Sequence, residues 1–175
     1  PLSPAGVAVH NSRTDVWSVG SPATNAVAAV AEDANLPVFV GSYASASGVS
    51  DAFVGGAAPI GPGGSDSFEF DARPGSRVSL VSMLVNTNDA FTGLDGVVLG
   101  GTTEVFEVGA YDAGTEPNDE QVVGGAPGTP GIPAAPADDA GQNATGVTTT
   151  EANTTVHVHR GVLGDTDATG GASDL

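Results

Sequence analysis

The chain has no cysteine and no lysine, and only 5% of its 175 residues are aromatic. Without cysteine the fold uses no disulfide, so the sequence does not reveal the redox state of its compartment. With so few aromatic side chains, valine, alanine and leucine must form most of the hydrophobic core. No stretch approaches the roughly 20 apolar residues of a membrane-spanning helix, so no transmembrane segment is expected.

Basic residues are almost as scarce. The chain carries 21 acidic residues and four arginines, which gives a net charge of −17. Such a chain repels phosphate backbones, and this argues against a nucleic acid as partner. In concentrated salt the self-repulsion is screened, because the Debye length falls to about 3 Å at 1 M. The acidic, lysine-free composition, rich in Ala, Val, Gly, Thr and Asp, resembles that of proteins from halophilic archaea.

Two further features predict an exported protein at the cell surface or outside the cell. The chain begins with Pro1 rather than methionine, which is typical of a chain whose signal peptide has been removed. It also contains two N-glycosylation sequons, at Asn143 and Asn153. We therefore expect an extracellular glycoprotein.

One segment, residues 21–35, is predicted to be a helix. Ser21 can cap it, Pro22 suits its first turn, and the alanines and valines that follow form an apolar stripe. We expect the helix to end where Asn35 is followed by Pro37. Residues 49–54 admit a second, shorter helix.

The remaining periodic segments predict strands. Phe68 and Phe70 alternate with acidic residues, and the apolar run from residue 77 to 85 follows after a short turn. The sequence therefore predicts an all-β fold, an antiparallel β-sandwich with one short α-helix. We expect a single domain over residues 1–165, a long Pro/Gly-rich surface loop at 115–146 and a flexible acidic tail at 166–175. The predicted strands cover residues 7–10, 15–20, 67–72, 77–85, 94–101, 102–114 and 154–162.

Two aspartates, Asp89 and Asp95, lie six residues apart in the polar segment 86–96, directly after the apolar run. Calcium takes six to eight oxygen ligands from carboxylates, carbonyls and water, and a loop of Asp, Asn and Gly can supply them. Asp112 and Glu116 follow another predicted strand and could face the same rim. Asp and Asn also cap turns very often, and spacing alone favours that interpretation.

The three histidines form a second candidate site. His157 and His159 lie two residues apart and share one face of a strand. With His10 they could hold zinc or copper, although two hydrogen-bonded structural histidines are the commoner arrangement. The sequence contains no nucleophile–base motif and no phosphate-binding loop, so we do not expect an enzyme.

Four segments, in chain order, resemble the spondin N-terminal domain family in its prokaryotic form, and the resemblance covers residues 1–165. Animal members of that family carry Ser-Pro-Asp-Trp where this chain has residues 87–90, so the aspartate, Asp89, is kept. The segments are SPATNAVAAVAEDANLP, VSMLVNTNDAFTGLDGV, YDAGTEPNDE and VHVHRGV.

The resemblance implies a sandwich related to C2 domains, with one calcium ion at loops on one edge. It implies adhesion or matrix association rather than catalysis. By position, Asp89 matches the family's ligand best, followed by Asp95, and then by Asp112 and Glu116.

Three functions remain open on the sequence. The first is a secreted, calcium-binding adhesion or matrix domain of a halophilic archaeon, with an extracellular protein or glycan as partner. The second is a structural subunit of an extracellular filament or sheath, in which copies of the chain complete one another by strand exchange. The third is a histidine-based metalloprotein.

Overall fold

A computed structural model describes residues 1–85, 87–116, 122–124, 135–136 and 154–161. Six strands form one antiparallel sheet in the order β2-β1-β3-β4-β5-β8. The elements are β1 (Ala5–His10), α1 (Asn25–Asp33), α2 (Leu36–Tyr43), β2 (Val49–Gly55), β3 (Arg77–Met83), β4 (Ala90–Val98), β5 (Ala110–Asp112), β6 (Val122–Gly124), β7 (Ala135–Pro136) and β8 (His157–Val158).

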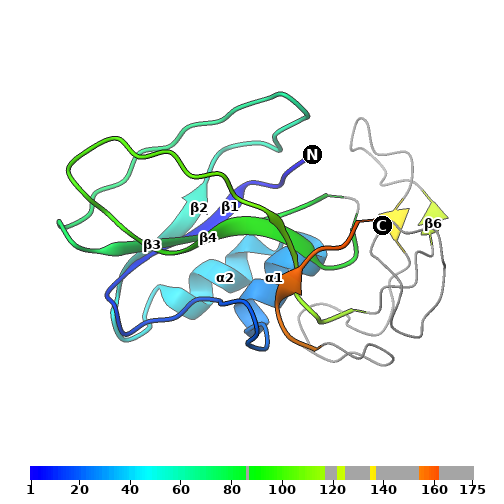
Figure 1. The fold of residues 1–175 in the computed structure, drawn as a ribbon, viewed down its shortest axis with the longest axis horizontal. Coiled ribbons are helices and arrows are strands. Elements are labelled where there is room, and N and C mark those ends of the chain that lie inside the picture. The colour runs from blue at the N-terminus through cyan, green and yellow to red at the C-terminus, as the bar shows by residue number, and fades with distance from the viewer. Residues whose placement is uncertain (86, 117–121, 125–134, 137–153, 162–175) are drawn as a thin grey trace.

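Both faces of this sheet are covered. Figure 1 shows α1 and α2 against one face, which we call the inner face, and two long connections arching over the opposite, outer face. These connections are residues 56–76, between β2 and β3, and residues 99–109, between β4 and β5. All six residues of β1 are buried because this strand has a core on each side.

The larger core lies between the inner face and the two helices. Val27 and Val30 of α1 and Phe39 of α2 are fully buried there against sheet residues such as Val81 and Phe91. Gly6 of β1 lets the Phe39 ring approach, since a Cβ at this position would lie 2.7 Å from the ring. The single tryptophan, Trp17, is a buried member of this core and lies edge-on to Phe91, at 5.1 Å between ring centroids.

A smaller core lies on the outer face. Ala5, Val7 and Val78 are its buried members, and half-buried side chains of both connections pack against them. Phe68 and Phe70 reach back from the first connection to Phe53 of β2, with ring centroids 5.9 and 5.4 Å away. Their alternation predicts a strand at 67–72, and this prediction is wrong: the segment pairs with no strand, and its aromatic rings pack on the sheet instead.

The helix predicted at 21–35 is confirmed as α1, which is shorter and begins at Asn25. Thr24, rather than Ser21, caps α1, and its hydroxyl accepts a hydrogen bond from the Val27 amide at 3.2 Å. Ala34 ends the helix in the left-handed conformation, at φ 51°.

A second helix, α2, was not predicted at its position. Pro37 lies in its first turn, where proline needs no amide hydrogen bond, so this residue begins a helix as well as ending one. The short helix expected at 49–54 is a strand, β2, which pairs with β1 along its whole length.

The fold is thus a mainly antiparallel sheet with two short helices. Strands β6 and β7 form a separate two-stranded sheet within the predicted loop 115–146. Among the described residues no second sheet packs across the outer face, and the sandwich stays a prediction. Most of that loop, the tail at 166–175 and the sequon residues Asn143 and Asn153 lie outside the described residues.

No helix in the described part of the chain has the length and apolar character needed to cross a membrane.

The close pairing of β3 and β4 leads to our first prediction. A Cβ at Gly93 would lie 1.8 Å from the Leu80 carbonyl oxygen, and backbone must move to admit it. Gly93→Ala should therefore lower the free energy of unfolding by about 2–3 kcal/mol, and thermal unfolding followed by circular dichroism measures this. Gly41→Ala is the control, because the exposed Gly41 of α2 has no atom within 4 Å of its would-be Cβ. The free energy of unfolding of that variant should rise by about 0.5–1 kcal/mol. Equal melting temperatures for the two variants would contradict the register of β3 against β4.

Candidate functional site

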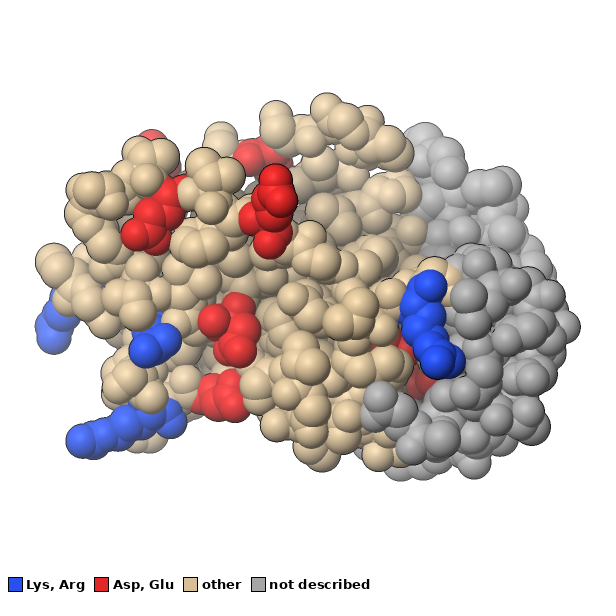
Figure 2. All heavy atoms as spheres, in the orientation of Figure 1, with Lys and Arg blue, Asp and Glu red and all other residues tan. Residues whose placement is uncertain are grey.

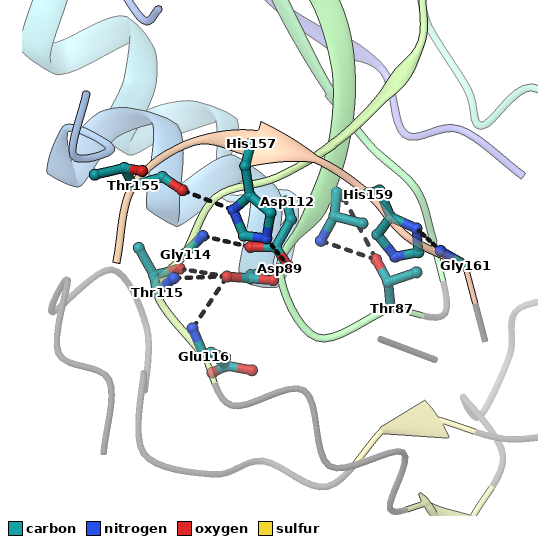
Figure 3. Close-up of polar contacts among 11 residues, drawn as sticks. Thr87, Asp89, Asp112, Gly114, Thr115, Glu116, Thr155, His157, His159 and Gly161 are labelled. Carbon is teal, nitrogen blue, oxygen red and sulfur yellow. Dashed lines mark hydrogen bonds and ion pairs between the residues drawn. The ribbon is translucent and has the colours of Figure 1, made fainter. Parts of the chain in front are cut away.

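Three acidic side chains are buried together at one end of the sheet, where β4 begins and β5 ends. Asp89, Asp112 and Glu116 are 0%, 2% and 4% exposed. The antiparallel register pairs Ala90 with Asp112, so Asp89 lies beside the residue that follows β5, and its carbonyl accepts the Ala113 amide at 3.1 Å. We call these three residues the carboxylate cluster (Figure 3).

The Asp89 carboxylate holds the turn that follows β5. Its Oδ2 accepts three hydrogen bonds, from the Thr115 amide at 2.7 Å, the Thr115 hydroxyl at 3.1 Å and the Glu116 amide at 3.0 Å. Hydrogen bonds to a charged acceptor are about twice as strong as neutral ones. A side chain before β4 thereby fixes a backbone segment 26 and 27 residues later in the chain.

Asp112 shapes the same turn from within. Its Oδ1 accepts the Gly114 amide at 2.6 Å, an Asx-turn geometry. Gly114 has φ +71°, and a Cβ there would lie 2.7 Å from the Thr155 amide nitrogen. Glycine is therefore required both by the backbone conformation and by the close approach of the segment that leads into β8.

His157 of β8 contacts the carboxylate cluster through its ring. Its Nε2 lies 3.3 Å from Asp112 Oδ2, and its Nδ1 lies 2.7 Å from the Thr155 carbonyl oxygen. Each of the two ring nitrogens therefore faces an oxygen of a different segment, one in β5 and one in the chain that leads into β8. Figure 3 shows the ring above Asp112, on the strand that closes this edge of the sheet.

The other two histidines have different partners. His159 Nδ1 accepts the Gly161 amide at 3.0 Å, so its proton is on Nε2 when the ring is neutral. His10 contacts Ser79 Oγ through Nε2 and the Asn11 carbonyl through Nδ1, both at 2.9 Å. Strand β1 is four strands from β8, about 19 Å at ~4.8 Å per strand. The structure therefore does not bring His10 to His157 and His159 as a metal site requires.

Asp95 is also separated from the carboxylate cluster. The segment predicted to be a calcium loop is strand β4 from Ala90 onward, and Asp95 is exposed within it. Six residues of a strand span about 20 Å, so Asp89 and Asp95 do not converge on one ion. The expectation that they do is contradicted, because residues 90–98 pair with β3 instead of forming a loop.

Asp95 lies in a different electrostatic environment. Its partial burial raises the pKa of its carboxyl above the ordinary value, and the charge of Asp15 raises it further. His10 and Arg77 act in the opposite direction. A concavity of about 900 Å³ is lined by His10 and Arg73 at this end of the sheet and does not include the carboxylate cluster.

The cluster offers hard oxygen donors, the chemistry that calcium and magnesium prefer. Within the described residues, no set of three or more His, Asp or Glu side chains is arranged to hold one metal ion. A cation here would take Asp112 and Glu116 as its carboxylate donors, and backbone carbonyls and water for the rest of its shell. Asp89 would position these groups through the turn that it holds.

Sequence reasoning missed Thr115 and Gly114, which complete the turn. The spacing Asp112-Ala113-Gly114 is a recognisable Asx-turn signal. No local signal predicts that the acceptor for the Thr115 amide is Asp89, since that pairing depends on the register of β4 against β5.

A scan against models of known protein families finds no match for this chain, and a comparison with curated proteins finds no significant similarity.

The hydrogen bonds of Asp89 make a second prediction. Asp89→Ala leaves the Thr115 and Glu116 amides buried without their acceptor, and each buried unsatisfied donor costs about 1–3 kcal/mol. We expect a loss of about 2–4 kcal/mol in denaturant unfolding, already present in buffer that contains a chelator. Glu107→Ala is the control and should change stability little, because Glu107 is exposed. If Asp89→Ala is harmless when divalent cations are removed, Asp89 does not hold the turn.

The raised pKa of Asp95 makes a third prediction. The carboxylate form of Asp95 is disfavoured in the folded state. Its ionisation therefore lowers the free energy of unfolding as the pH rises from the ordinary value of 3.8 to the raised pKa of the folded state, and the loss stays constant at higher pH. Asp95→Asn cannot ionise and should be more stable than the wild type at pH 7. The difference should vanish below pH 3.8, as melting temperatures at constant salt can show. A difference that persists unchanged at pH 3 would mean that ionisation is not its cause.

Proposed function

We propose that this chain is an extracellular, salt-adapted binding domain of adhesion or matrix type that takes a calcium ion at the ends of β4, β5 and β8. One observation carries the proposal: Asp89, Asp112 and Glu116 are almost completely buried together at one end of the sheet. Buried carboxylates are stable only when cations or hydrogen-bond donors compensate their charge.

The distribution of basic residues supports a cation at this position. The chain has four arginines, three histidines and no lysine. Arg13, Arg73 and Arg77 belong to the end of the sheet where β1 ends and β3 begins, and Arg160 is exposed after β8. Figure 2 shows the same separation, with blue side chains at the left end and one at the right. At the end that holds the carboxylate cluster, where Arg160 is the one arginine, a divalent cation would add further positive charge.

The adhesion or matrix part of the proposal rests on the sequence. The spondin-type segments, the two sequons and the acidic, lysine-free composition all favour an extracellular protein in a salt-rich medium. Two of these segments, VSMLVNTNDAFTGLDGV and YDAGTEPNDE, contribute the three residues of the carboxylate cluster. The proposed partner is an extracellular protein or glycan.

A calcium titration at constant ionic strength tests the proposal and is our fourth prediction. At low ionic strength, a free calcium concentration of 100 times Kd should stabilise the fold by about 2.7 kcal/mol. That corresponds to a rise in melting temperature of roughly 5–10 °C for a chain of this size. Sodium chloride at the same ionic strength should give a smaller, non-saturating rise, because it acts only by screening.

Two matched variants separate a specific site from screening. Glu116→Gln removes a buried charge and should abolish the saturable part of the calcium effect. Glu107→Gln removes an exposed charge and should keep it. Equal effects of calcium and sodium at matched ionic strength, or an unchanged titration of the Glu116 variant, would refute a calcium site in the cluster.

A further inference from the structure

A second concavity lies on the other side of the molecule from the helices, between the outer sheet face and the two connections that cover it. It has a volume of about 320 Å³, within the range of small-molecule sites. Leu80 of β3 and Leu94 of β4 form its floor, and Phe68, Phe106 and Val108 of the connections form its walls. We call it the outer cavity.

Its mouth is an exposed apolar surface. Phe106 is 48% exposed and Val108 47% exposed, although both line the outer cavity. Val105, in the same extended segment, is 88% exposed and does not line it. Apolar side chains gathered around a cavity mouth mark binding sites more often than scattered single ones do.

The polar groups of the lining define which ligand fits. The Thr92 hydroxyl donates to the Gly109 carbonyl and the Ser82 hydroxyl to the Ser3 carbonyl, both at 2.7 Å, so these hydroxyls are engaged within the protein. Asp66 is the charged residue of the lining. Its two oxygens accept one backbone amide each, from Ser67 at 2.7 Å and from Ala57 at 3.3 Å, and a carboxylate can accept further hydrogen bonds.

The charged side chains around the outer cavity are negative, as Asp66 is. Glu69 and Asp71 lie in the first connection and Glu104 and Glu107 in the second, and no arginine lines the cavity. Acidic side chains are spread over this view of the molecule in Figure 2, while the basic ones lie at its two ends. An anionic ligand such as a fatty acid would be repelled here, and a cationic head would be attracted to Asp66.

We propose that the outer cavity binds a small apolar molecule with a cationic, amine-type head. The apolar body lies against Leu80, Leu94 and Phe106, and the head lies at Asp66. This site is separate from the carboxylate cluster and does not depend on calcium.

Two probes of the same chain length and opposite charge test the proposal, our fifth prediction. Octylammonium and octanoate, both below their micelle concentrations, are titrated into the folded chain by calorimetry in the same salt. We expect saturable 1:1 binding of the cation, at least tenfold tighter than that of the anion. Asp66→Asn should bring the two affinities together, because it removes the charge and keeps the shape.

The apolar half of the site has its own pair of variants. Phe106→Ala should weaken binding of the cation at least fivefold, and Val105→Ala should leave it unchanged. Melting curves establish that each variant is folded, and Val108→Ala replaces Phe106→Ala if the latter is not. Equal affinity for the two probes, absence of saturation, or equal effects of the two variants would overturn the proposal. Concentration-dependent dimerisation that Phe106→Ala abolishes in sedimentation would also overturn it, because a second copy would then cover this face.

Discussion

The buried carboxylate of Asp89 is the interaction on which the candidate end of this molecule depends. It lies at the start of β4, yet its three hydrogen bonds fix the turn after β5. That turn carries Glu116 and packs, through Gly114, against the segment that leads to His157. Removing the Asp89 side chain would therefore release the turn that follows β5 and the contact of this turn with the segment that leads into β8. The same geometry gathers three carboxyl groups, and this is the basis on which we propose a cation as the ligand of this end.

A chain with so few aromatic residues and so much negative charge still needs a hydrophobic core. It has two separate cores, one on each face of a single sheet, under helices on one side and irregular connections on the other. The inner face is packed against small side chains of α1 such as Ala26 and Ala31. Among the residues that the structure describes, loops rather than a second layer of paired strands cover the outer face, which keeps a cavity. The two proposed sites thus come from different features: one from buried charge at a strand end, the other from incomplete cover of an apolar face.

Parts of this fold could be predicted because their signal is local. The apolar stripe of α1 and the apolar run of β3 are periodic over several residues, and the structure has both. Pro37 is typical of a helix end, yet it lies in the first turn of α2. Phe68 and Phe70 alternate as in a strand but have no partner strand. The separation of Asp95 from Asp89 could not be foreseen, since 86–96 is rich in turn formers and only pairing with β3 makes it a strand. In the same way, the contact of Asp112 with His157 follows from the β5–β8 register, which one sequence does not encode visibly.

Terbium luminescence tests the central claim, a cation held at the carboxylate cluster, most directly. Terbium takes the same oxygen ligands as calcium and emits when a nearby aromatic ring transfers energy to it. Tyr111 directly precedes Asp112, and its ring lies 4.9 Å from that of Trp17, so sensitisers are in place beside the cluster. The account predicts saturable sensitised emission that calcium displaces and that Asp112→Asn removes. Emission that is absent, or that persists in this variant, would contradict it.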